Sequence, residues 1–349
     1  MVETTPVRRA LALLAVGLGA GLTARELSRR RGAIELRGRV VLITGGSRGL
    51  GLALARRCAD EGARLAICAR DRGELERASV ELTGRGAEVL TIVCDVADRA
   101  QVERMVEQTT ARFGRVDVLI NNAGVIQVGP FDLQTPADYE ESLSVMFWGV
   151  LHASMAVLPQ MRARGDGRIV NITSIGGKIA VPHLLPYNCA KFAAVGFSES
   201  LRAEVARDGV MVVTVVPGLM RTGSHVNAFF KGQHRLEYSL FSPLSCLPGS
   251  SVSVGYAADR IVRALKRGDA ELTIGLPATL AARFAGLFPG LAADLFGLVN
   301  RLLPGPGGIG PERRRGRESE TAFSSSPLTA LGRRAARDLN QLAEPTVGT

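Results

Sequence analysis

Three polar side chains near the middle of the chain have the types and spacing needed for acid–base chemistry. Tyr187 and Lys191 stand four positions apart, so in a helix they share one face. Ser174 lies 13 residues before Tyr187, after a run of residues typical of a strand. A phenol has a pKa of about 10, but a neighbouring ammonium group stabilises the phenolate and lowers that pKa. We therefore predict that Tyr187 exchanges a proton with a carbonyl or alcohol oxygen, assisted by Lys191, while Ser174 orients that oxygen.

A glycine-rich segment indicates where a dinucleotide would bind. Thr44–Gly51 follows the first expected strand and opens the first expected helix. Backbone amides at a helix N-terminus face a phosphate, and glycines allow the tight turn and a close approach of the diphosphate. The residues expected to contact the dinucleotide here are Gly45, Ser47, Arg48, Gly49, Leu50 and Gly51.

The end of the second expected strand indicates which dinucleotide is used. Arg70 stands where an acidic residue would bind both ribose hydroxyls of NAD. With Arg48 it is placed to bind a 2′-phosphate through charge-assisted hydrogen bonds, which favours NADP(H). The alternative is that Asp71 takes the acidic role and both arginines are solvated. Further contacts are expected where later strands end, with Asp95 reaching the adenine, at Asp95, Val96, Asn122, Ala123 and Gly124.

Apolar runs alternate with helix-length segments from Arg39 onward, which predicts the frame for these residues. The expected strands are Val40–Thr44, Arg64–Ala69, Glu88–Cys94, Val116–Asn121, Arg168–Thr173, Val210–Val216 and Glu271–Ile274. The expected helices include Leu50–Glu61, Arg99–Phe113, Ala137–Arg164 and Phe192–Arg207. Continuous apolar strands alternating with helices indicate a parallel sheet covered on both faces. Residues 38–275 are therefore expected to form a single α/β, doubly wound, Rossmann-like domain.

The segments outside this alternation suggest contact with apolar partners. Residues 1–37 contain an apolar run, Ala10–Ala24, whose length as a helix, roughly 22 Å, is short of a ~30 Å hydrocarbon core. We expect a membrane anchor there, with a processed signal peptide or a cytosolic packing helix as alternatives. Residues 276–303 predict one or two amphipathic helices, used either for core or oligomer packing or at a membrane surface or substrate channel. Residues 304–349 are typical of a largely disordered tail.

Residues 219–255 interrupt the alternation after one strand and are expected to form a lid over the substrate. Four aromatic residues in this insert favour a bulky apolar substrate over a sugar, because polar ligands need several placed hydrogen-bond partners: Phe229, Phe230, Tyr238 and Phe241.

Composition excludes several other classes of function. Most of the net charge of +10 falls in residues 1–37 and 304–349, away from the predicted domain, which argues against a nucleic-acid partner. Five widely spaced cysteines exclude a disulfide framework and fit a reducing compartment. With four histidines and no HExxH motif, a metal site is not expected. We expect the protein to be cytoplasmic, either free or attached to the membrane through residues 10–24.

Taken in order, these motifs resemble the short-chain dehydrogenase/reductase family over residues 38–275. The resemblance implies dependence on a nicotinamide dinucleotide, the roles given above for the central trio, and assembly as a dimer or tetramer. It also implies that Pro217 and Gly218 border the nicotinamide and that Thr222 bonds its carboxamide. The matching segments are Thr44–Gly51, Asp95, Asn121–Gly124, Ser174, Tyr187–Lys191 and Pro217–Gly218 with Thr222.

One position departs from the family's pattern. Where the family usually carries a catalytic Asn, three residues before a Gly, this chain has Met146. A thioether has no N–H and accepts hydrogen bonds weakly, so it cannot hold the water that links Lys191 to solvent.

The expected function is hydride transfer from NADPH to a lipophilic ketone or aldehyde, since cellular NADP is mostly reduced. A non-catalytic nucleotide-binding protein of the same fold is the alternative. A sugar-nucleotide epimerase is a third, and would need a C-terminal sugar-binding domain.

Overall fold

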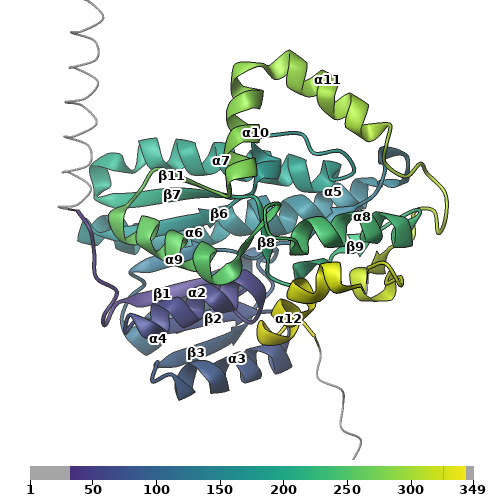
Figure 1. The fold of residues 1–349 in the computed structure, drawn as a ribbon. Coiled ribbons are helices and arrows are strands. Elements are labelled where there is room, and N and C mark those ends of the chain that lie inside the picture. The colour runs from purple at the N-terminus through teal and green to yellow at the C-terminus, as the bar shows by residue number, and fades with distance from the viewer. Residues whose placement is uncertain (1–31, 325, 343–349) are drawn as a thin grey trace, which may run out of the picture.

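A seven-stranded sheet forms the centre of the computed structural model, which describes residues 32–324 and 326–342 (Figure 1). All of its strands are parallel, in the order β11-β7-β6-β4-β1-β2-β3. The strands are β1 (Val40–Thr44), β2 (Arg64–Ala69), β3 (Val89–Val93), β4 (Val118–Asn121), β6 (Gly167–Ile172), β7 (Val210–Pro217) and β11 (Glu271–Ile274). The chain order reverses between β1 and β4, and ligands of such sheets bind beyond the carboxyl ends of the strands at that point. The doubly wound α/β fold predicted from the sequence is confirmed.

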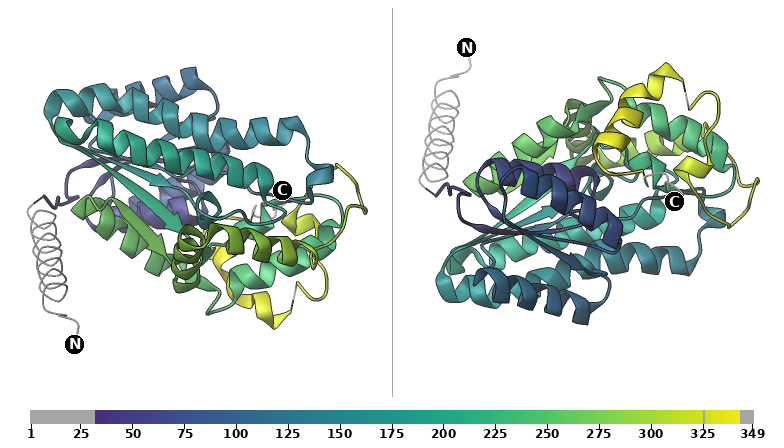
Figure 2. Two further views of the ribbon diagram at one scale, coloured as in Figure 1. Left: turned by 90° about the horizontal axis from the view of Figure 1, so that it is seen from above. Right: turned by 90° about the horizontal axis from the view of Figure 1, so that it is seen from below.

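Helices cover both faces of the sheet (Figure 2). One face carries α2 (Gly49–Asp60), α3 (Arg72–Gly84) and α9 (Val254–Arg267). The other carries α4 (Arg99–Phe113), α6 (Gly149–Arg164) and α7 (Leu185–Glu204).

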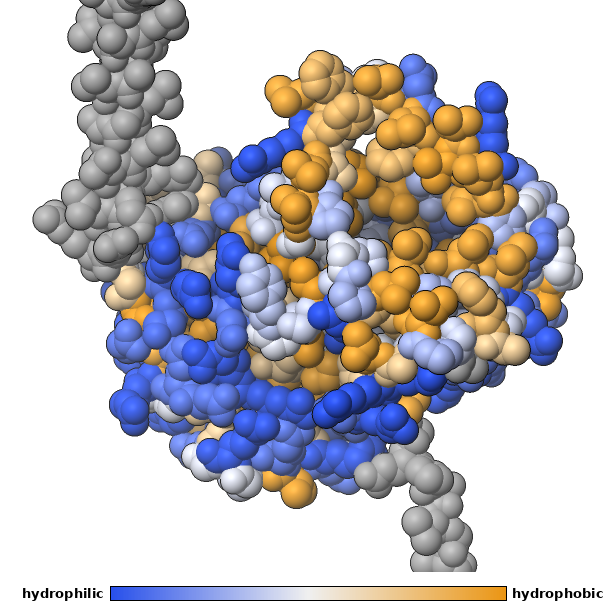
Figure 3. Space-filling model, viewed as in Figure 1, coloured by the Kyte–Doolittle hydropathy of each residue, from blue (hydrophilic) through white to orange (hydrophobic). Residues whose placement is uncertain are grey.

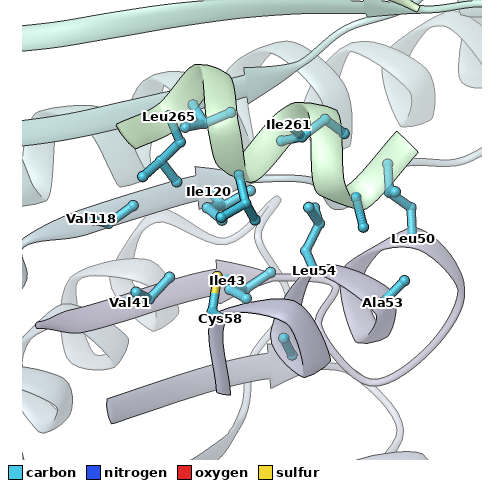
Figure 4. Packing of buried hydrophobic residues seen from close by; sticks show 14 of the residues in the cluster. Val41, Ile43, Leu50, Ala53, Leu54, Cys58, Val118, Ile120, Ile261 and Leu265 are labelled. Carbon is cyan, nitrogen blue, oxygen red and sulfur yellow. The ribbon is translucent and has the colours of Figure 1, made fainter. Parts of the chain in front are cut away.

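The alternation of side chains along β1 divides the core into two layers. Val41 and Ile43 point into the layer beneath α2 and α9 (Figure 4). Val40 and Leu42 point into the layer beneath α4 and α6. Every residue of β1 is buried, which explains why this strand is a continuous apolar run without polar alternation.

The chain from Pro136 to Arg164 runs as one long helix with an irregular turn inside it. The turn is π-helical, η2 (Ser144–Trp148), and lies between α5 (Pro136–Leu143) and α6. Within the described ranges, this is the one helix long and apolar enough to cross a membrane. It lies against α4 and α7 as a core helix, and these contacts account for its apolar composition.

The insert after β7 folds into short elements with a core of their own. They are β8 (Leu219–Arg221), η5 (Ser224–Val226), β9 (Phe229–Phe230), α8 (His234–Cys246) and β10 (Ser251–Ser253). Phe230 and Tyr238 are fully buried with their rings edge to face, 5.3 Å between centroids. Phe241 joins them at 5.8 Å from Phe230. Phe230 and Tyr238 therefore complete the interior of the insert, where the sequence suggested that they line a substrate site.

The segment expected to be a largely disordered tail contains ordered elements in its described residues, 304–324 and 326–342. Its elements are β12 (Arg314–Arg315), which pairs antiparallel with β9, and the helix α12 (Ala330–Asp338). Small residues make this docking possible, because a Cβ on Gly332 would lie 2.1 Å from the sulfur of Cys246. Composition does not show such contacts. The predicted anchor at residues 10–24 lies outside the described residues.

A helical hairpin rises beside the carboxyl edge of the sheet. It consists of α10 (Leu276–Leu287) and α11 (Pro289–Asn300), which meet at Phe288. Its buried positions are Ala278 and Ala292, so most of its leucines face solvent. Figure 3 shows apolar side chains gathered over the hairpin and over the neighbouring face of α8.

Candidate active site

The structure brings the predicted trio together where β6 meets α7. Tyr187 and Lys191 lie one turn apart on α7, and the Nζ atom of Lys191 is 5.8 Å from the centre of the Tyr187 ring. Lys191 donates a hydrogen bond to the carbonyl of Ile172, at 2.9 Å. Ser174 follows β6 and its hydroxyl hydrogen-bonds to the phenol of Tyr187.

Two glycines that the sequence analysis did not single out allow this close approach. A Cβ on Gly176 would lie 2.8 Å from Oδ1 of Asn188 and 3.1 Å from a ring carbon of Tyr187. A Cβ on Gly177 would lie 2.6 Å from the carbonyl oxygen of Lys191. Only glycine therefore fits where the turn after Ser174 lies against α7, and the pair of glycines after Ser174 is the feature of the sequence that indicates it.

Burial decides the pKa values of the two titratable groups. Burial raises the pKa of Tyr187, and the hydrogen bond from Ser174 acts in the opposite direction. Burial also lowers the pKa of Lys191 to about 8. Burial therefore moves the pKa of the phenol in the direction opposite to the one expected from Lys191.

Replacing Lys191 with Met is expected to stabilise the fold near neutral pH while abolishing turnover. The pKa of Lys191 is about 8 when folded against 10.5 as its ordinary value, so the unfolded chain binds the proton more tightly. The charge therefore opposes folding fully below pH 8, and the opposition fades between pH 8 and 10.5. We expect Lys191→Met to raise the free energy of unfolding at pH 7 by about 1–3 kcal/mol, with the gain shrinking toward pH 10. Urea unfolding at both pH values measures this, and a less stable variant at pH 7 would contradict it.

The glycine loop forms a tight cradle at the N-terminus of α2. Gly45 and Gly49 have left-handed φ angles of 63° and 58°. A Cβ on Gly51 would lie 2.0 Å from the carbonyl oxygen of Gly45. Asn122 holds the loop from the end of β4, because its Nδ2 donates to the carbonyls of Thr44 and Gly45, both at 3.0 Å. These residues fit the diphosphate of a dinucleotide, since the glycines of the loop itself place no side chain over the helix N-terminus.

The polar side chains of this loop are paired with a residue that the sequence analysis did not single out. Glu74 accepts hydrogen bonds from the hydroxyl of Ser47 at 2.9 Å and from Arg48 at 2.7 Å. Asp71 caps α3, because its carboxylate accepts a hydrogen bond from the amide of Glu74 at 2.8 Å. The sequence analysis considered this same carboxylate as a partner for the ribose of NAD. The Asp71/Glu74 spacing, typical of a helix start, is the feature of the sequence that could have indicated this.

The remaining predicted contacts lie around the same edge of the sheet. Arg70 has a side chain 67% exposed and lies 3.9 Å from the carboxylate of Asp95. Asp95 also accepts from the amide of Ala97 at 3.0 Å. Val96 lies against Gly149, where a Cβ would come within 3.0 Å of its side chain.

The segment after β7 closes the other side of this edge. The amide of Gly218 donates to the carbonyl of Ile274 at 2.9 Å. A Cβ on Gly218 would lie 2.8 Å from the Cβ of Ala278 at the start of α10. Pro217 ends β7 and Thr222 is buried, so the exposed hairpin begins directly beside the predicted nicotinamide position.

Met146 lies fully buried in the π-helical turn η2. Its sulfur would be 3.6 Å from a Cβ on Gly124, so the thioether faces the segment after β4. A π-helical turn inside a long helix often marks a functional position, which fits the position where the family usually carries an Asn.

Comparisons with known proteins agree with this fold and geometry. The sequence profile of the short chain dehydrogenase family matches residues 39–231. The putative oxidoreductase SadH of Mycobacterium tuberculosis is 38% identical over 244 residues, covering 69% of this chain and 87% of that protein. Levodione reductase of Leifsonia aquatica is 41% identical over 187 residues, covering 53% of this chain and 70% of that protein. A solved short-chain dehydrogenase from Streptomyces avermitilis has a TM-score of 0.63 at 32% identity, covering 75% of this chain and 98% of that one. The chain therefore belongs to the short-chain dehydrogenase/reductase family, oxidoreductases that interconvert carbonyl and alcohol groups with a nicotinamide dinucleotide.

Proposed function

We propose that this enzyme reduces a lipophilic ketone or aldehyde with NADPH, using Tyr187 as the acid. The observation that carries the proposal is the meeting of Ser174, Tyr187 and Lys191 at the same carboxyl edge of the sheet as the glycine loop, with only β4 between β1 and β6. The overall reaction converts a carbonyl compound, NADPH and a proton into the alcohol and NADP⁺.

Each member of the trio has a defined task in this reaction. The bound dinucleotide supplies the hydride that the carbonyl carbon takes up. Ser174 donates a hydrogen bond to the carbonyl oxygen and fixes its position. Tyr187 gives its phenolic proton to that oxygen as negative charge develops on it. The ammonium group of Lys191, 5.8 Å from the ring, stabilises the phenolate that remains.

A group of arginines supports NADP(H) over NAD(H). Arg70 is exposed beside the end of β2, where the 2′-phosphate of the adenosine ribose would lie. Arg315 of β12 is close enough for the charges of Arg48 and Arg70 to add to the lowering of its pKa by burial. Guanidinium groups gathered in this way repel one another, and a bound phosphate would reduce that repulsion.

Replacing Arg70 with Ala is expected to weaken NADPH binding by about tenfold or more, because it removes a charge-assisted bond to the 2′-phosphate. NADH, which lacks that phosphate, should bind as it does to the unchanged protein. Titration of dinucleotide fluorescence measures both affinities, with Arg207→Ala, at a remote exposed arginine, as the matched control. An equal loss of affinity for NADPH and for NADH would contradict the assignment of Arg70 to the 2′-phosphate.

The exposed apolar surface beside the site supports a lipophilic substrate. Leu280 of α10 and Leu291 of α11 are each 58% exposed, and α10 starts against Gly218. Leu236, Leu240 and Leu244 add an exposed face on α8. A large apolar patch of this kind marks a ligand or membrane surface, and we propose that it receives the substrate's apolar part at a membrane surface. The name of the relative levodione reductase is consistent with a ketone substrate.

The substrate proposal is tested by NADPH consumption on a panel of carbonyl compounds. We expect kcat/KM to rise with the apolar chain length of the ketone or aldehyde. The double substitution Leu280→Ser and Leu291→Ser should raise KM for long-chain compounds several-fold and leave short ones unchanged. Val80→Ser, at an exposed valine of α3, is the matched control. Turnover confined to small polar carbonyls would reject a lipophilic substrate.

A non-catalytic dinucleotide-binding protein is the second candidate, and Met146 is the observation that favours it. A buried thioether cannot hold the relay water. Water held by backbone groups can serve instead, so we rank this candidate below the reductase. For assembly, we propose the dimer or tetramer common in the family.

A further inference from the structure

The last described residues of the chain lie on the surface that would bind the dinucleotide. After α12 ends at Asp338, the chain crosses the N-terminus of α2. The carbonyl of Leu339 accepts a hydrogen bond from the amide of Gly49 at 2.9 Å. Gly49 is the first residue of α2, and the amides at a helix N-terminus are the groups that hold a phosphate. The chain therefore already supplies an acceptor where a phosphate oxygen would bind.

Asn340 extends this contact along the loop. It adopts a left-handed backbone conformation with φ of 55°. Its Nδ2 donates to the carbonyls of Ser47 at 2.9 Å and Glu74 at 3.0 Å. Its Oδ1 accepts from Arg77 at 2.7 Å. Every polar atom of this side chain is thus engaged by the loop and by α3, which makes the position specific.

Gln341 spans the space between the glycine loop and the segment after β7. Its side chain is buried, and its Nε2 donates to the carbonyl of Thr222 at 3.3 Å. The same nitrogen lies 2.6 Å from the place a Cβ on Gly49 would take. Asn227 holds Gln341 by donating to both its carbonyl and its Oε1, each at 2.8 Å. The side chain therefore fills the gap between the two segments expected to enclose the dinucleotide.

The helix that presents these residues is firmly docked. A Cβ on Gly223, which has φ of 73°, would lie 2.4 Å from the Cα of Ala336. Arg56 donates to the carbonyl of Asp338 at 2.6 Å. Contacts this close between backbones require glycine, so α12 and Leu339–Gln341 form a built element.

We propose that Leu339–Gln341 is an autoinhibitory strap that occupies the diphosphate position and must leave before the dinucleotide binds. The proposal rests on the proposed function, since it needs the glycine loop to bind NADPH. The amide of Gly49 cannot donate fully to Leu339 and to a phosphate at once, and Gln341 occupies the space beside it.

Release of the strap should tighten dinucleotide binding. When a competent state is a fraction of all molecules, the apparent Kd is the intrinsic Kd divided by that fraction. A strap closed in about nine of ten molecules weakens binding about tenfold. Removing residues 339–349 while keeping α12, or substituting Gln341→Gly, is therefore expected to tighten NADPH binding at least about tenfold.

Fluorescence titration with NADPH compares the full chain, the truncated chain and Gln341→Gly. Arg334→Ala, on the exposed side of α12, is the control and should bind as the full chain does. Affinity that is unchanged or weaker in both shortened and substituted proteins would overturn the strap and leave the proposed function standing. Binding by none of the proteins would overturn both.

Hydrogen exchange supplies a second measurement on the full chain. It does not depend on whether the truncated protein folds. Saturating NADPH should speed amide exchange in residues 330–341, because the strap is displaced. Slower exchange there would mean that the segment closes over the bound dinucleotide, and would overturn the proposal.

Discussion

Replacing Tyr187 with Phe is expected to lower kcat for carbonyl reduction by about 10³-fold and to leave NADPH affinity within about twofold. Phe keeps the ring that lies 5.8 Å from Lys191 and removes only the hydroxyl that bonds Ser174. The loss therefore reports the proton transfer. Hydrogen-bonding and packing around the glycine loop are untouched, so dinucleotide binding should persist.

Steady-state NADPH consumption with the best ketone of the panel measures this loss, and fluorescence titration measures the affinity. Tyr256→Phe is the matched control, because Tyr256 is exposed on α9 and its hydroxyl bonds only Arg260 among the contacts described. Its kcat should be unchanged. A Tyr187→Phe enzyme that keeps more than about a tenth of the activity would remove the phenol from the mechanism.

The second large effect is expected at Gly51. Substitution of Gly51→Ala places a Cβ 2.0 Å from the carbonyl oxygen of Gly45 and 2.6 Å from Nδ2 of Asn122. The backbone oxygen cannot yield without breaking the hydrogen bonds from Asn122 that hold the loop. We expect NADPH affinity to fall by about 100-fold or more and stability to fall by about 3 kcal/mol.

Gly84→Ala is the matched control for this substitution. Gly84 ends α3, and a Cβ there would meet nothing within 4 Å. Its alanine variant should bind NADPH normally and be equally or slightly more stable, since Ala favours helix over Gly. Urea unfolding and dinucleotide titration on both variants decide the matter. If the Gly51→Ala protein bound NADPH as tightly as the unchanged chain, the glycine loop would have room for a Cβ at this position, which contradicts the structure.

The sheet could be predicted from the sequence because its strands are buried on both faces. Val40–Thr44 is apolar at every position but the last, since successive side chains enter two separate apolar layers. Such an apolar run can be recognised in the sequence without knowing which elements pack against it. All seven strands lie within two residues of the predicted ranges.

The folded C-terminal segment could not be predicted because its stability comes from distant contacts. Gly223 receives Ala336, and Gly332 receives Cys246, across about a hundred residues of chain. A polar, arginine-rich segment gives no local indication of these partners. The π-helical turn at Met146 could not be predicted either, because its composition is that of an ordinary helix.

The candidate site divides in the same way. The shared face of Tyr187 and Lys191 follows from helical spacing alone. The pairing of Arg48 with Glu74 and the raised pKa of Tyr187 depend on groups brought in by the fold. Spacing therefore predicts which residues meet, and the tertiary structure decides their charge and partners.

Transfer of deuterium from NADPH that carries deuterium at both positions of nicotinamide C4 tests the central claim most directly. With the best ketone of the panel, we predict alcohol carrying the deuterium at its carbinol carbon, formed in step with NADPH loss and almost absent in Tyr187→Phe. NADPH consumption that yields no deuterated alcohol, or deuterium transfer that proceeds equally in Tyr187→Phe, would contradict the account.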